Sequence, residues 1–235
     1  MFFRTPSSIL VAGPSGSGKT VFVSQLLRDP PRYFRGLPKN VHYCYGAWQA
    51  KFVPLQKKGV HFHEGLPDTA DLDSWFGRTR GGLLVLDDLM DEGGNDKKVL
   101  DLFTKDSHHR NITVLYLVQD LFPRGKYAKT ISRNAHYIVV FKNPRDQTGI
   151  RILLQQMFPT YWREALRVYM KATARPFTYL MIDLHPASND AYRLYTNILR
   201  DEGYASTFVQ RRQDHGIPLR RRLFEPSSSS RRRRI

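Results

Sequence analysis

The sequence predicts an α/β protein whose central sheet is mainly parallel, and three observations lead to that prediction. Short apolar runs alternate with helical stretches between Ser7 and about Leu184. A glycine-rich loop joins the first apolar run to the first helix. The run at 83–86 is continuously apolar and lies between a glycine pair and an aspartate pair, as expected for a strand buried on both faces.

Each element follows from its local pattern. Ser8–Ala12 is a short apolar run before a loop, and Lys19–Arg28 is a helix that the sequence Asp-Pro-Pro ends. The further expected strands are Val41–Tyr45, 60–63, 83–86, Ile112–Val118, Tyr137–Phe141 and, as the last one, 177–183. The further expected helices are 71–76, 97–107, 148–158 and 161–172. An acidic, glycine-containing loop is expected at 91–96.

Composition narrows the class of protein. The chain has 235 residues, with 37 Lys and Arg against 21 Asp and Glu, so its net charge is +16, which indicates polyanionic partners. Cys44 is the only cysteine, which excludes a scaffold built on internal disulfides. The apolar runs are far too short to cross a bilayer, and the first 13 residues lack the pattern of a signal peptide. We therefore expect a soluble, intracellular protein with no membrane partner.

The C-terminal segment is compositionally different from the rest of the chain. Residues 211–235 contain nine arginines and carry a net charge of +7. The last ten residues, PSSSSRRRRI, are of low complexity and lack the apolar side chains of a core. We expect a body at 1–204 and a basic, disordered tail at 205–235. Such a tail is typical of a nuclear-localisation signal or a nucleic-acid-binding patch.

One motif predicts a phosphate-binding loop. Residues 13–20 match G-x-x-x-x-G-K-[ST] and lie between a strand and a helix, where backbone N–H groups and the helix N-terminus hold phosphates. Lys19 is placed to reach the β- and γ-phosphates, and the Thr20 hydroxyl to bind Mg²⁺. The predicted phosphate-binding residues are Gly13, Pro14, Ser15, Gly16, Ser17, Gly18, Lys19 and Thr20.

Two further strand ends carry polar residues. Asp87 and Asp88 follow the apolar run at 83–86, which delivers carboxylates to the sheet edge beside the phosphate loop. Asp87 is the expected Mg²⁺-side acid, and Asp88 is a candidate general base for the attacking water. Gln119 ends the next strand, Ile112–Val118, so its amide is expected at the same edge, near the γ-phosphate or the attacking water.

Together these motifs resemble those of the additional-strand, RecA-like class of phosphate-loop ATPases, and within it the HerA–FtsK superfamily. The closer resemblance is to the genome-packaging ATPases of poxvirus-like large DNA viruses and of Polinton/Maverick elements. It rests on GPSGSGKT (13–20), LLVLDDLM (83–90), SHHRNITVLYLVQDLF (107–122), NAHYIVVFKNPRD (134–146) and FTYLMIDLHP (177–186).

The resemblance implies a three-layer phosphate-loop NTPase fold over about residues 5–200. It also implies a homohexameric ring that hydrolyses ATP with Mg²⁺ and moves double-stranded DNA into a capsid, with a capsid or portal-vertex protein as partner. The protein would be located at a viral assembly site, in the host nucleus or in the virion. Carried over by position, Gln119 senses the γ-phosphate, while Asp88 stands where many pumps of the superfamily have glutamate.

Such rings usually bring an arginine from one subunit to the γ-phosphate of the next. Arg110, just before the Gln119 strand, is the first candidate, and Arg124, Arg133 and Arg145 remain open.

Two other functions remain open. The first is a small-molecule phosphotransferase, since the loop GPSGSGKT is also similar to loops of nucleotide kinases and transporter ATPases. The chain lacks an LSGGQ-like transporter signature and an arginine-rich lid within its body, and a metabolic kinase has no use for a tail of charge +7. The second is a non-enzymatic DNA-binding protein that keeps a nucleotide switch. The hydrolytic set is complete, which argues against an inactive site: Lys19, Thr20, Asp87 and Asp88.

Overall fold

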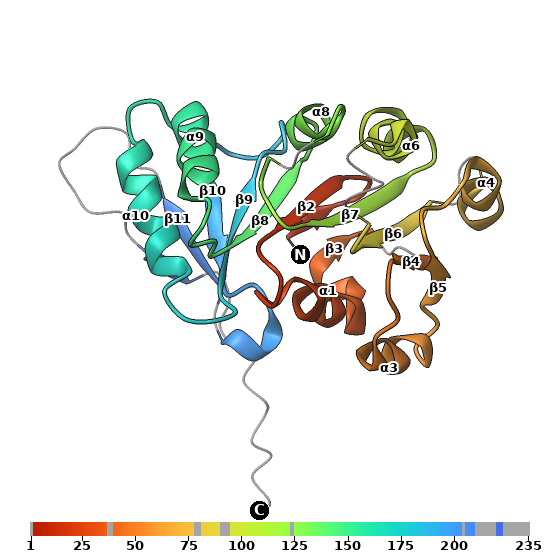
Figure 1. Cartoon of the computed structure of the whole chain (residues 1–235). Helices are drawn as coiled ribbons and strands as arrows, with labels where there is room; N and C mark the ends of the chain where they lie inside the picture. Colours follow the sequence, from red (N-terminus) through yellow and green to blue (C-terminus); the bar gives the residue numbers. More distant parts are fainter. Residues whose placement is uncertain are drawn as a thin grey trace, which may run out of the picture.

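The strands of this protein form a central sheet that helices cover on both faces (Figure 1). The computed structural model describes residues 2–36, 40–77, 81–89, 95–122, 125–203, 205–209 and 220–222. The strands are β1 (Phe3–Arg4), β2 (Ser8–Ala12), β3 (Phe34–Arg35), β4 (Val41–Tyr45), β5 (His61–Glu64), β6 (Gly82–Asp87), β7 (Ile112–Val118), β8 (Tyr137–Phe141), β9 (Tyr179–Asp183), β10 (Tyr192–Thr196), β11 (Ser206–Val209) and β12 (Arg220–Arg222).

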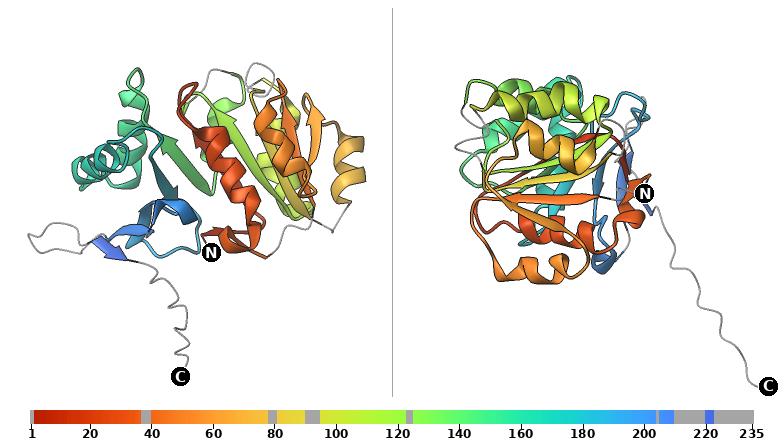
Figure 2. Two further views of the ribbon diagram at one scale, coloured as in Figure 1. Left: turned by 90° about the horizontal axis from the view of Figure 1, so that it is seen from below. Right: turned by 90° about the vertical axis from the view of Figure 1, so that its right-hand side faces the viewer.

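The helices fall into two layers. They are α1 (Lys19–Arg28), α2 (Pro30–Tyr33), η1 (Ala50–Phe52), α3 (Val53–Gln56), α4 (Thr69–Phe76), α6 (Lys97–Asp101), the π-helical turn η2 (Leu102–Asp106), α7 (Ser107–His109), α8 (Ala128–Arg133), α9 (Gln147–Met157), α10 (Trp162–Ala172) and η3 (Arg200–Glu202). One apolar core contains residues of α4, α6, α8, α9 and α10, and a second contains residues of α1, α2 and α3. The right-hand view of Figure 2 shows helices on both sides of the sheet. The three-layer arrangement is therefore as expected.

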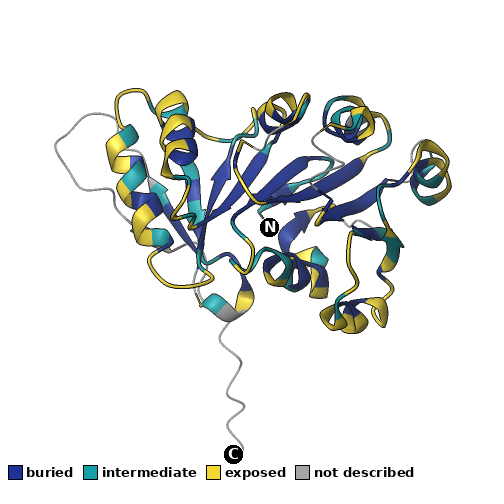
Figure 3. Cartoon of the chain, viewed as in Figure 1, coloured by how far each residue is buried: buried dark blue, intermediate teal, exposed yellow. Residues whose placement is uncertain are grey.

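Within the described residues, ten strands form one sheet in the order β12-β11-β10-β9-β8-β2-β7-β6-β4-β5. The strands from β8 to β5 run parallel, and β7 lies between β2 and β6. Their side chains are buried on both faces, except along the edge strand β5 (Figure 3). This burial explains why β2, β6, β7 and β8 are continuous apolar runs rather than alternating ones.

The prediction of a mainly parallel sheet is wrong, because the sheet is mixed. The strands β9, β10, β11 and β12 pair antiparallel with their neighbours. The cause is the connection after β8, which consists of two helices that pack on each other, α9 and α10. A single crossover helix returns the chain to the end of the sheet where the preceding strand began, and the next strand then runs parallel to it. A pair of helices instead brings the chain back to the end where β8 finished, so β9 runs in the opposite direction.

The sheet also extends further along the chain than expected. The run at 177–183 is not the last strand, since β10 and β11 follow it, and β11 lies beyond the expected end of the body at 204. The residues 210–219 and 223–235 of the expected disordered tail lie outside the described residues, as do most of those of the expected acidic loop at 91–96. In the part of the chain that is described, no helix is long and apolar enough to cross a membrane.

Candidate nucleotide site

The loop after β2 has the backbone that the phosphate-binding motif predicts. Gly16 and Gly18 have φ angles of 75° and 105°, in the left-handed region that glycine adopts without strain. Gly13 packs closely against β8, the neighbour of β2 in the sheet, because a Cβ atom there would lie 2.8 Å from Cβ of Phe141. The helix α1 begins directly after the loop, at Lys19. The N–H groups of its first turn therefore face the loop, as phosphate binding requires.

The Lys19 ammonium is held within the loop. Its Nζ donates hydrogen bonds to the carbonyl oxygens of Gly13 (2.6 Å) and Pro14 (3.1 Å). Burial lowers the pKa of Lys19, and the carboxylates of Asp87 and Asp88 oppose that shift. A partly desolvated cation beside backbone N–H groups interacts strongly with a phosphate oxygen, since few water molecules compete for it.

Asp87 and Thr20 form the candidate metal site. Asp87 ends β6 and is 4% exposed, and its Oδ2 accepts hydrogen bonds from Thr20 Oγ1 (3.0 Å) and from the hydroxyl of Tyr43 (2.6 Å). Burial raises the pKa of Asp87, while the bonds from Tyr43 and Thr20 oppose that rise because they favour the ionised carboxylate. A carboxylate beside a hydroxyl is a donor set of hard oxygen atoms that fits Mg²⁺, which takes its remaining ligands from phosphate and water.

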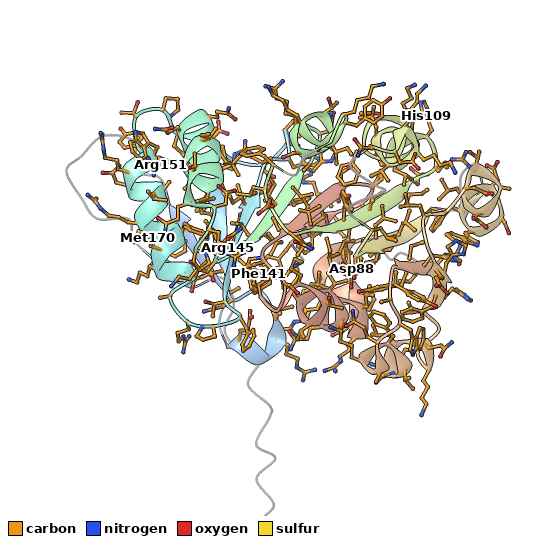
Figure 4. The ribbon with its side chains drawn as sticks, in the orientation of Figure 1. Asp88, His109, Phe141, Arg145, Arg151 and Met170 are labelled. Atoms are coloured by element: carbon orange, nitrogen blue, oxygen red, sulfur yellow. The ribbon has the colours of Figure 1, made fainter. Side chains whose placement is uncertain are left out.

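Asp88 lies in a backbone conformation that is unusual for its side chain. Its φ is 60°, in the left-handed region, and it is exposed at the end of β6 (Figure 4). The segment that follows β4 holds it there, because the N–H of Gly46 donates to the carbonyl of Asp87 (3.1 Å). A Cβ atom at residue 46 would overlap the Asp88 carbonyl oxygen, so glycine is required for this approach. The turn separates the two carboxylates, with Asp87 buried and Asp88 open to solvent.

One pocket brings the predicted residues together. It has a volume of about 750 Å³, and its lining includes Lys19, Thr20, Asp87, Asp88 and Gln119. Gln119 is at this edge because it follows β7, which pairs with both β2 and β6. The loop residues 15–18 line the same pocket.

Sequence reasoning missed three residues of this site. Tyr43 lies within a strand and looks like a core aromatic until its bond to Asp87 is seen. Lys51 in η1 lines the pocket, and its charge lowers the pKa of both Asp87 and Lys19. Phe177 lines the pocket from the segment before β9, whereas the prediction placed it inside that strand. Tyr43 and Lys51 lie outside the quoted motifs, and Phe177 begins the segment FTYLMIDLHP, which predicted only a strand. Tertiary contacts are what connect all three to the site.

The candidate arginines lie in different places. The guanidinium of Arg110 forms an ion pair with Asp73 of α4. This ion pair lies at the amino end of β7, whereas the phosphate loop lies near its carboxyl end, about 20 Å away along the strand. Arg133 ends α8, near the amino end of β8. Arg145 follows β8 at the edge that carries the phosphate loop (Figure 4), and Arg124 lies outside the described residues. A trans-acting role for any of them stays a prediction.

No protein-family model matches this chain, and no curated protein sequence matches it either. Among solved structures, it is similar to the genome packaging NTPase B204 from Sulfolobus turreted icosahedral virus 2 in complex with AMP, with a TM-score of 0.48 and 12% identity over 76% of this chain and 93% of that chain. The complex of that protein with ATP-γS gives a TM-score of 0.44 and 13% identity over the same shares. The crystal structure of B204, the DNA-packaging ATPase from Sulfolobus turreted icosahedral virus, gives a TM-score of 0.46 and 13% identity, again over 76% of this chain and 93% of that chain. All three of these solved structures are of viral genome packaging proteins.

Proposed function

We propose that this protein is an ATP-hydrolysing motor that moves double-stranded DNA and packages a viral or virus-like genome into a capsid. The observation that carries the proposal is the convergence of Lys19, Thr20, Asp87, Asp88 and Gln119 on one pocket. This set provides a cation for the phosphates, oxygen ligands for a metal ion, an exposed carboxylate and an amide, which are the groups that hydrolysis of a nucleoside triphosphate requires.

Each group has a distinct part in the proposed reaction. The loop N–H groups and Lys19 bind the phosphates, and Thr20 and Asp87 would hold Mg²⁺, which would supply positive charge against the phosphates. Gln119 orients the water that attacks the γ-phosphorus. Asp88 accepts the proton of that water as the bond to ADP breaks. The exposed position of Asp88 suits this part, because water reaches its carboxylate directly.

The strand order supports the choice among phosphate-loop proteins. Because β7 lies between the phosphate-loop strand β2 and the acidic strand β6, Gln119 stands between the loop and the two carboxylates. This inserted strand is what the name additional-strand class describes. A polar group on it contacts the γ-phosphate or the attacking water and so distinguishes the triphosphate from the diphosphate, which a motor needs to couple hydrolysis to movement.

Charge supports DNA as the polymer that is moved. A net charge of +16 attracts phosphate backbones without regard to sequence, and nine arginines lie at 211–235. The proposal includes a homohexameric ring in which an arginine such as Arg110 or Arg145 reaches the neighbouring subunit's nucleotide. It also includes a capsid or portal-vertex protein as partner and a viral assembly site as location.

The test is steady-state ATP hydrolysis with and without long double-stranded DNA. We expect DNA to stimulate hydrolysis, Lys19→Ala to abolish it, and Asp88→Asn to abolish turnover while leaving nucleotide binding intact. Normal hydrolysis by Lys19→Ala would contradict the phosphate-loop assignment. Hydrolysis that is indifferent to DNA but increases with a nucleoside or nucleotide acceptor would instead identify a phosphotransferase.

A further inference from the structure

The segment between α10 and β9 contains a strained turn. The N–H of Thr178 donates to the carbonyl of Arg175 (3.4 Å), and its hydroxyl donates to the same oxygen (2.7 Å), so that residues 175–178 form a β-turn. Pro176 occupies the second position, and Phe177 occupies the third with a φ of 64°. A turn with proline second and a positive φ third favours glycine or asparagine at that third position. A bulky phenylalanine there is a backbone outlier, and such outliers cluster at functional sites.

Core packing does not explain this phenylalanine. At 69% exposure, Phe177 is the most exposed large apolar side chain among the described residues. Its ring lies against the phosphate loop, because a Cβ atom at Gly18 would be 3.4 Å from the ring carbon Cδ1. The side chain also lines the same pocket as Lys19 and Thr20. The turn thus holds an apolar ring at the phosphate loop, where it stays open to solvent.

The order of the strands shows which end of a nucleotide faces Phe177. The phosphate loop follows β2, and Gln119 and Asp87 lie on the side of β7 and β6. Phe177 precedes β9, on the opposite side of β2. A triphosphate whose γ-phosphate points toward Asp87 therefore directs its nucleoside toward Phe177. Val21, in the first turn of α1, lines the same pocket and is 52% exposed.

We propose that the ring of Phe177 stacks on the nucleobase of the nucleoside triphosphate bound at the phosphate loop, an inference that rests on the proposed function. Stacking removes from water an apolar face that is otherwise exposed, which offsets the strain of the turn when nucleotide is bound. Since every base has a π-face, the contact holds the base without choosing among bases. The site therefore binds both ATP and GTP through this ring.

Phe177→Gly tests the contact without disturbing the fold, because glycine suits the third position of the turn. With Mg²⁺ present, calorimetry would measure the binding of ATP, GTP and inorganic tripolyphosphate to the full chain. We expect the variant to bind both nucleotides about fivefold to a hundredfold more weakly, from the usual contribution of base–aromatic stacking. Tripolyphosphate, which has no base, should bind as it does to the wild type, and the unfolding temperature without ligand should not fall.

Two matched variants complete the design. Phe177→Trp keeps an aromatic face and should retain nucleotide affinity, whereas Met170→Ala removes another exposed apolar side chain (63% exposed), outside the pocket, and should change nothing. Equal affinity of the wild type and Phe177→Gly for ATP would overturn the base contact while leaving the proposed function in place. An equal loss for ATP and tripolyphosphate would overturn it too, since the ring would then act on the phosphate loop. A wild type that binds no nucleotide would refute the proposed function itself.

Discussion

The hydrogen bond between Tyr43 and Asp87 allows a test of how the buried carboxylate of Asp87 is held. Tyr43 is fully buried on β4, and its hydroxyl donates to Oδ2 of Asp87 at 2.6 Å. The substitution Tyr43→Phe removes one oxygen atom and leaves a buried carboxylate with one partner fewer. A hydrogen bond to a charged group contributes about 1.5–3 kcal/mol to the free energy of unfolding. In a chain of this length each kcal/mol shifts the melting temperature by about 2–4 °C, so we expect a fall of about 3–12 °C at neutral pH.

The pH dependence of that loss has a definite sign. The Tyr43 hydroxyl stabilises the ionised form of Asp87 and so lowers its pKa, against the burial that raises it. Removing the hydroxyl raises the pKa of Asp87 in the folded variant above that in the folded wild type. Between these two pKa values the folded variant binds more protons than the folded wild type, so the stability deficit shrinks as the pH falls through them. Above both, the deficit is largest and constant.

The assay is thermal unfolding of the nucleotide-free protein at a series of pH values from neutral to acidic. Tyr116→Phe is the matched control, because Tyr116 is also buried within a strand, but its hydroxyl has no hydrogen-bond partner among the described residues. Its removal should leave the melting temperature unchanged or raise it slightly. Equal melting temperatures for Tyr43→Phe and Tyr116→Phe at neutral pH would refute the reasoning. So would a Tyr43→Phe deficit that does not change with pH.

Three further predictions concern the pocket and the tail. Gly46→Ala should reduce ATP hydrolysis more than it weakens ATP binding, since a Cβ atom there displaces the Asp88 backbone. Steady-state hydrolysis rates and ATP dissociation constants, measured together, would show this, and unaltered turnover would contradict it. Gln119→Ala should lower kcat at least tenfold while ATP affinity stays within a few fold, measured the same way, because an amide that orients water acts mainly in the transition state. Deleting 211–235 should weaken DNA binding at physiological salt and flatten its salt dependence without removing basal hydrolysis; unchanged DNA affinity in salt titrations would return the tail to a targeting or solvating role.

Local sequence alone predicted much of the fold and of the candidate site. The bounds of β2, α1, β4, β7 and β8 agree with those expected from residue patterns. The glycine-rich loop between β2 and α1 and the aspartate pair at the end of β6 lie where the sequence placed them, because the signals that define them lie within a few consecutive residues. Their roles in binding and hydrolysis stay predictions. A glycine loop between a strand and a helix, or an acid after an apolar run, requires no information about distant parts of the chain. That these groups would share one sheet edge also followed, because parallel strands end on the same side.

What the sequence left undecided depends on contacts between distant residues. The direction of β9 follows from the packing of α9 against α10, and β10 and β11 lack the continuous apolar pattern that marks the central strands. Arg110 pairs with Asp73 across the chain, which its position before β7 does not indicate.

The same holds for the finer parts of the site. Tyr43, Lys51 and Phe177 belong to it only because β4, η1 and the turn before β9 meet around the phosphate loop. Short motifs therefore predict which chemical groups the candidate site contains, since a loop or a strand end is a local structure. How that chemistry is supported is decided by tertiary packing, because burial, hydrogen-bond partners and exposed rings arise only when segments far apart in the chain come into contact.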